Sequence, residues 1–261
     1  MRFLDTNLCT QTATVITASS QQANFAVSNL VNPFRSKVWR STGCASEWVT
    51  FDFATAVQVD TCCLFWSKEN GPKLTTAATI TLQGNATNSW SSPAFSTSLS
   101  VNNTYSIASY FTANGTNQTY RYWRITIADP LNGFGYVELG VAFMGVSVAL
   151  PNTSNGFKYS LTDLSNVITT AFGHRYVDKY PLMAQLDFSY PNIDDATISL
   201  LENSFRSRGS SGPVLFAVDP TAAVYNKDHF ILYGTFVTPF GNTQQISNIF
   251  TTDLLSISEL S

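Results

Sequence analysis

Residues 120–127, YRYWRITI, decide the fold, because their side chains divide into two classes by parity. The odd-numbered positions include Trp123, Ile125 and Ile127. The even-numbered positions include Tyr122, Arg124 and Thr126. This alternation is typical of a half-buried β-strand. We therefore expect one face of the strand in a core and the other face displayed at the surface.

The same alternation recurs through the first part of the chain. Its apolar positions are Val49, Phe51 and Phe53, then Val57 and Val59, and later Val137, Leu139, Val141 and Phe143. Ser/Asn/Gly-rich loops separate these strands, and residues 83–104 and 112–119 are the most irregular. The segment 151–156, PNTSNG, is typical of a linker. We predict two domains, residues 1–150 and 151–261, with a mainly β fold.

The second part has a different pattern, in which a strand over 181–190 precedes one helix. The helix reads NIDDATISLLENSFRSRG, with Asn192 as its cap and Gly209 at its end. Its predicted apolar stripe comprises Ile193, Ala196, Leu200, Leu201 and Phe205. Further strands follow the helix, so we predict a smaller α+β domain with one main helix.

Composition excludes several classes of function. Charged residues make up 12% of the 261 residues, against about 25% in an average soluble domain. The net charge of −3 and the scattered basic residues provide no stripe for phosphates, so we expect no nucleic-acid partner. The apolar stretch 139–150 is shorter than a membrane span needs. The start MRFLDTNLCTQ lacks the pattern of a signal peptide, so we expect synthesis in the cytoplasm.

The four cysteines, Cys9, Cys44, Cys62 and Cys63, form no C-x-x-C pair and have no histidines beside them. Neither a zinc site nor a redox motif is indicated. Cys62 and Cys63 are adjacent in a predicted strand, so we expect at most one of them in the core. A disulfide between that residue and Cys44 stays open as an alternative to free thiols.

No catalytic pattern stands out. The run 208–213, RGSSGP, follows a helix and lacks the G-x-S-x-G spacing of a nucleophile elbow. His174 and His229 belong to no metal-binding motif, and Asp194 and Asp195 suit the start of a helix. No phosphate-binding glycine loop occurs. We expect a protein that is not an enzyme and uses no cofactor.

Three segments share a pattern: NFAVSNLVNPFRSKVWRSTG at 24–43, EWVTFDFATAVQVDTCCLFW at 47–66, and YRYWRITI at 120–127. Together they resemble the discoidin or coagulation-factor type C family of galactose-binding-like β-sandwiches. The resemblance covers roughly residues 15–146 and implies a jelly-roll sandwich. Its core would hold the apolar residues of 123–127 beside Trp48, Phe51 or Phe53. By the same resemblance Arg121 and Arg124 would lie on the solvent face. Its ligand sites would lie on loops at one end of the sandwich.

The resemblance also implies candidate ligands. Sugar-binding relatives typically hydrogen-bond sugar hydroxyls with a histidine and arginines. Here both histidines, His174 and His229, fall outside the predicted domain. Arg35, Arg40 and Trp90, with Lys37 nearby, would form a shallow glycan site. In the alternative interpretation Trp90 anchors a loop and the basic residues are solvated or face a partner. Relatives often hold a structural calcium ion, and the corresponding segment 27–34 lacks an aspartate.

The second part is similar to structural proteins of long-tailed bacteriophages. The likeness is carried by FGHRYVDKYPLMAQLDFSY at 172–190, the helix, GSSGPVLFAVDP at 209–220 and YGTFVTPF at 233–240. It implies a virion protein of the distal tail or baseplate, which forms a ring with copies of itself and contacts other tail proteins. Leu201, Phe205 and Phe236 would belong to the assembly interface. The alternative function is a carbohydrate-binding module that adheres to host-surface glycans.

Overall fold

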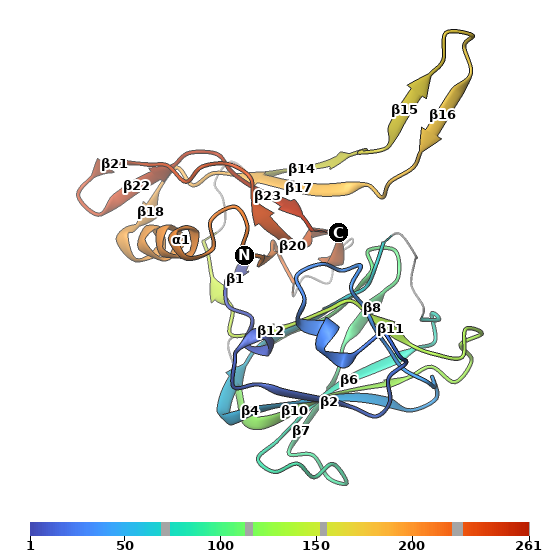
Figure 1. The fold of residues 1–261 in the computed structure, drawn as a ribbon. Coiled ribbons are helices and arrows are strands. Elements are labelled where there is room, and N and C mark those ends of the chain that lie inside the picture. Colours follow the sequence, from blue (N-terminus) through green and yellow to red (C-terminus); the bar gives the residue numbers. More distant parts are fainter. Residues whose placement is uncertain (69–73, 113–116, 152–155, 221–226, 261) are drawn as a thin grey trace. The chain divides into compact units, whose positions relative to one another are not determined.

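The computed structural model describes residues 1–68, 74–112, 117–151, 156–220 and 227–260. It is mainly β, with 47% strand and 10% helix, which confirms the predicted fold class. The chain divides into two compact units (Figure 1). The sandwich unit comprises Thr6–Val148 and Asp219–Phe230. The α+β unit comprises Met1–Asp5, Ala149–Val218 and Ile231–Ser261.

The two units do not follow a single division of the chain at residue 150, because two segments fold with the other unit. Met1–Asp5 belongs to the α+β unit because Arg2–Leu4 pairs antiparallel with Leu215–Ala217. Asp219–Phe230 belongs to the sandwich unit, where Asp228 accepts hydrogen bonds from Asn102 and Ser109. Most of the predicted linker, residues 152–155, lies outside the described residues.

The sandwich unit contains two main antiparallel sheets. One has the order β2 (Val15–Ala18), β4 (Glu47–Val59), β10 (Gln118–Ala128), β6 (Thr79–Asn85) and β7 (Phe95–Ser98). The other has the order β12 (Val141–Gly145), β5 (Thr61–Phe65), β9 (Ile107–Phe111) and β8 (Ser100–Asn102). The segment 83–104, expected to be irregular, therefore includes β7 and β8. Shorter elements are β3 (Trp39–Arg40), β11 (Glu138–Leu139), and the 3-10 helices η1 (Leu8–Thr10), η2 (Val27–Val31) and η4 (Lys227–Phe230).

The core of the sandwich follows the predicted parity. Trp123 and Ile125 of β10 are buried beside Val49 and Phe51 of β4, with which they pair in register. Trp48, one of the three alternative neighbours expected for this core, lies outside it, whereas Phe51 pairs in register with Trp123. The position of Trp48 has the opposite parity to Val49 and Phe51, so its indole lies on the outer face, where it covers Arg124.

Strand β5 is buried on both faces. Cys62 and Cys63 are each 0% exposed, and of the two only Cys62 belongs to the hydrophobic core cluster of the sandwich, as expected. The outer face is covered within the unit by the distant segment that carries Asp228, whose carboxylate accepts from Ser109, the register partner of Cys63. All four cysteines are free thiols.

The α+β unit is built on a seven-stranded antiparallel sheet. Its order is β13 (Val148–Ala149), β1 (Arg2–Leu4), β19 (Val214–Ala217), β20 (Ile231–Phe236), β23 (Leu255–Glu259), β17 (Met183–Phe188) and β14 (Phe157–Thr162). A smaller sheet has the order β18 (Ile193–Asp194), β22 (Ile249–Thr252) and β21 (Asn242–Ile246). Helix α1 (Asp195–Arg208) packs on β18 and β22. Beyond β14 and β17 the chain continues into the hairpin of β15 (Asn166–Thr169) and β16 (Arg175–Asp178) (Figure 1).

Helix α1 begins two residues later than predicted. Its cap is Asp194, whose carboxylate accepts from the Thr197 amide, and Asn192 does not cap it. Ile193 consequently belongs to strand β18, and the buried helix residues are Ile198, Leu201 and Ser204. The expected end at Gly209 is confirmed.

Candidate functional site

The outer face of the five-stranded sheet carries a guanidinium group between two indole rings. The Arg124 guanidinium carbon lies 4.1 Å from the Trp48 ring centroid and 4.4 Å from that of Trp90. Its Nε donates a hydrogen bond of 2.8 Å to the Thr50 hydroxyl. We call Trp48, Thr50, Trp90 and Arg124 the Arg124 platform. Both indole contacts are favourable cation–π arrangements.

Strand register explains how the platform is assembled. Arg124 of β10 lies directly opposite Thr50 of β4, and Trp48 precedes Thr50 by two residues on the same face. Trp90 comes from the connection between β6 and β7. Its indole nitrogen donates to the Asn88 side chain at 2.7 Å. The platform therefore joins two neighbouring strands and one loop.

The electrostatics of the platform combine a positive charge with partial loss of water around it. Burial lowers the pKa of Arg124 to about 10, so the group stays protonated near neutral pH. Next to it, Arg121 donates to both oxygens of Asp52 at 2.7 and 2.9 Å. That hydrogen-bonded pair lowers the pKa of Asp52. Arg121 is thus neutralised within the sheet face by a carboxylate.

The structure does not bring the predicted glycan residues together at a surface. Arg35 is 1% exposed, and its guanidinium donates to the carbonyl oxygens of Trp66 and Ser106 at 3.2 and 3.0 Å. Its side chain holds two loops in place and is closed to a ligand. Lys37 is exposed.

Arg40 is held by a carboxylate and by aromatic rings. It donates to Glu138 at 2.6 and 2.8 Å, and its guanidinium carbon lies 3.9 Å from the Phe25 ring centroid and 4.5 Å from that of Tyr136. Of the three predicted glycan residues, only Trp90 belongs to the platform. The opposite parity to Trp123 was the sequence signal that placed Arg124 at the surface.

His229 lies in the sandwich unit, so the expectation that both histidines fall outside this domain is wrong for His229. Its segment folds back onto the sandwich, and its Nδ1 lies 2.8 Å from the Tyr105 hydroxyl. Burial, with a smaller contribution from Lys68, lowers the pKa of His229. His174 is exposed between β15 and β16.

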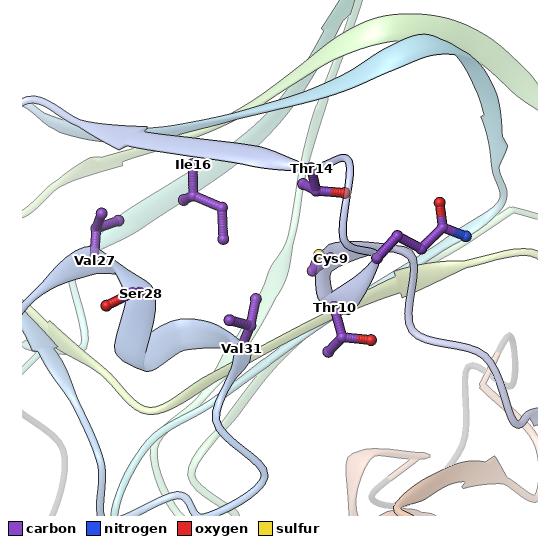
Figure 2. Close-up of a pocket in the computed structure, with 8 residues that line it drawn as sticks. Cys9, Thr10, Thr14, Ile16, Val27, Ser28 and Val31 are labelled. Carbon is purple, nitrogen blue, oxygen red and sulfur yellow. The ribbon is translucent and has the colours of Figure 1, made fainter.

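A pocket of about 240 Å³ lies between η1, β2 and η2 (Figure 2). Its lining includes the apolar side chains of Ile16, Val27 and Val31 and the hydroxyls of Thr10, Thr14 and Ser28. Cys9 also lines it, and burial raises the pKa of this thiol well above its ordinary value. The lining contains no charged side chain, so the pocket has no group suited to acid–base catalysis.

The described ranges contain no cluster of three or more His, Cys, Asp or Glu side chains that could hold a metal ion. Within the same ranges, no helix is long and apolar enough to span a membrane.

The hairpin of β15 and β16 forms an arm that is exposed on both faces (Figure 1). We define the arm as residues 163–182. Phe172 at its turn is 91% exposed. Its other exposed large side chains are Leu164, Val167, Ile168, Tyr176, Val177, Tyr180 and Leu182. Sequence reasoning missed the arm, although apolar residues flank Gly173, which adopts the positive φ of 80° that a tight turn requires.

The residues predicted for assembly lie elsewhere in the α+β unit. Leu201 and Phe236 are each 2% exposed. Phe205 packs against Phe236 and Phe240, with ring centroids 5.6 and 6.0 Å apart. These side chains pack helix α1 against the sheet and are separate from the exposed side chains of the arm.

No protein-family model and no curated protein matches the chain. Solved structures with some likeness include carbohydrate-binding modules and lectin domains. A Streptococcus pneumoniae fucose-binding module has 15% identity and a TM-score of 0.41, with 54% of this chain and 94% of the module covered. The lectin domain of lectinolysin, complexed with Lewis B antigen, has 12% identity and a TM-score of 0.44, with 55% and 98% covered.

A GH29 fucosidase from Ruminococcus gnavus, in complex with fucose, has 14% identity and a TM-score of 0.44. The match covers 55% of this chain and 27% of the fucosidase, so the chain corresponds to a small part of that enzyme's length.

Proposed function

We propose that this chain is a non-enzymatic structural protein that assembles with copies of itself through the arm and displays the sandwich unit. The arm supports this function because it exposes large apolar side chains on both faces. An isolated two-stranded hairpin is at best marginally stable in water, and exposed apolar patches of this kind mark interaction surfaces. The outer edges of β15 and β16 also present unpaired backbone groups.

The proposed occupant of the arm is a second copy of the chain. Between residues 163 and 182 the arm carries Asp163, Asp178, Arg175 and Lys179, which sum to a net charge of zero. One copy therefore does not repel the arm of another. An arm that reaches a different surface of the next copy makes a head-to-tail contact, and repetition of such a contact gives a ring when the rotation between copies closes.

Sedimentation velocity of the full chain tests this assembly. The wild type is expected to form an oligomer at micromolar concentration, and the variant I168S/F172S/Y176S is expected to be a folded monomer. The matched control is L131S/F134S, which removes exposed apolar side chains of the sandwich unit (79% and 55% exposed) and should leave the oligomer intact. A monomeric wild type, or an oligomer unaffected by the arm substitutions, would contradict the proposal.

The place of such an assembly is the tail tip or baseplate of a long-tailed phage particle, made in the host cytoplasm. This location rests on the sequence resemblance of the second part and on the arm. Immunogold labelling of particles from the producing culture checks it. Gold at one tail end is the expected result, and particles without label, using an antibody that detects native protein, would remove the virion assignment.

A second function, glycan binding, belongs to the sandwich unit. The observation that favours it is the Arg124 platform, where partly exposed indoles and a guanidinium lie among hydroxyl and amide side chains of neighbouring strands. Aromatic faces and guanidinium groups are common partners of sugars. A screen of the full chain against a broad glycan array tests this function, and the absence of any binding would contradict it.

A further inference from the structure

Arg124 differs from three other arginines of the chain in having no carboxylate partner among the described residues. Arg40 pairs with Glu138, Arg121 with Asp52 and Arg206 with Glu202. Arg124 instead contacts the Thr50 hydroxyl through Nε and the two indole rings through its faces. Its positive charge is therefore not compensated by a negative one inside this sheet face.

The platform fixes the Arg124 side chain and leaves its outer nitrogens available. The hydrogen bond to Thr50 uses Nε, and no hydrogen bond joins Nη1 or Nη2 to a residue that the structure describes. The two indole contacts restrict the position of the guanidinium group. A guanidinium held in one orientation loses little side-chain entropy when its two outer nitrogens donate to a carboxylate.

The groups around Arg124 are neutral and polar. In register, Arg124 lies opposite Gln83 of β6, while Thr126 lies opposite Thr81 and Tyr122 opposite Asn85. These side chains share the outer face and are partly exposed. Hydroxyl and amide groups of this kind both donate and accept hydrogen bonds, as sugar hydroxyls require. The face thus combines one uncompensated cation with partners for hydroxyl groups.

The low positive charge of this face restricts how many negative charges the ligand can carry. A densely charged polyanion needs several cations in a row, and this chain has a net charge of −3. The neighbouring Arg121 is already neutralised by Asp52. A ligand with one carboxylate per sugar ring matches a face with a single available guanidinium.

We propose that the Arg124 platform binds a uronic acid unit of an acidic glycan, with the sugar carboxylate accepting from Nη1 and Nη2 of Arg124. The inference rests on the glycan-binding function proposed above and assigns it a ligand class and a site. Gln83 and Thr126 contact the sugar hydroxyls, whereas the Asn85 side chain is hydrogen-bonded to Ser89 and Ala86. The site lies on the outer face of the sheet, where the connection between β6 and β7 contributes Trp90.

Isothermal titration calorimetry of the full chain with trigalacturonate, and with neutral galactotriose as the matched ligand, tests this site. The wild type is expected to bind trigalacturonate at least tenfold more tightly than galactotriose. R124Q should lose at least tenfold in affinity for trigalacturonate, and R124K should lose nearly as much because an ammonium lacks the planar pair of donors. R121Q, which removes the same charge from the same strand, should stay within twofold of wild type.

The outcomes separate this inference from the glycan function itself. Equal binding of both trisaccharides, or binding unaffected by R124Q, would overturn the carboxylate site and leave a glycan function intact. No binding of either trisaccharide would overturn the site, and the array would then decide the glycan function. If penta-glutamate binds as tightly as trigalacturonate, the site recognises a carboxylate without the sugar, and the proposal of a uronic acid ligand is overturned. Far-ultraviolet circular dichroism and the melting temperature confirm that each variant is folded.

Discussion

At the scale of single residues, the ion pair of Arg40 and Glu138 makes a sharp prediction. The Glu138 side chain is 3% exposed and that of Arg40 is 23% exposed. R40M leaves a buried carboxylate without its cation, so the free energy of unfolding should fall by about 3 kcal/mol. Urea denaturation of the full chain measures the change. R206M is the control, because its pair with Glu202 is 73% and 37% exposed, and it should change stability by less than about 0.5 kcal/mol. Similar losses in the two variants would contradict this account.

The buried thiols provide a second prediction at this scale. Burial raises the pKa of Cys9, Cys62 and Cys63 above the ordinary thiol value of 9.0. At pH 8 iodoacetamide should therefore label only Cys44 in the folded protein, and all four cysteines in urea, as counted by mass spectrometry. These thiols ionise at a lower pH in the unfolded chain than in the folded protein. Their contribution to the free energy of unfolding is therefore fully present below pH 9 and should decline as the pH rises further. Rapid labelling of native Cys62 would show that β5 is accessible.

At the scale of elements, Gly234 is required where β20 pairs with β23. A Cβ atom at this position would lie 2.1 Å from the Ser258 carbonyl oxygen, which is backbone and cannot move aside without opening the sheet. G234A should destabilise the α+β unit by about 3 kcal/mol. Differential scanning calorimetry measures the loss. G133A is the control, because a Cβ there meets nothing within 4 Å and should leave the melting temperature unchanged.

The same scale explains which parts of the fold were predictable from the sequence. The alternation of apolar and polar residues along β4 and β10 was sufficient to predict the sandwich core. Phe51 and Trp123 are buried because of their position in that local alternation. The burial of Cys63 on the outer side of β5 depends on Asp228, which is distant in sequence and lacks any local signal. One part of the Arg124 platform was predictable, because the parity of Arg124 places it on the outer face. The contact with Trp90 was not predictable, because a loop residue has no periodicity that indicates where its side chain lies.

At the scale of the whole molecule, composition and the arm together define the kind of assembly to expect. Only 12% of residues are charged, and the arm offers mainly apolar side chains with no net charge. Contacts between copies should therefore depend on burial of apolar surface more than on ion pairs. Assembly of this kind differs in its response to salt and temperature from assembly held by surface charges.

We therefore expect the oligomer to persist in 1 M NaCl, where the screening length is only about 3 Å. Cooling from 25 to 4 °C should weaken it, because the hydrophobic contribution falls at lower temperature. Sedimentation equilibrium over these conditions measures both effects, with I168S/F172S/Y176S as the monomeric reference. Dissociation in high salt together with strengthening in the cold would indicate contacts through charged groups, and the arm would then not be the surface that joins the copies.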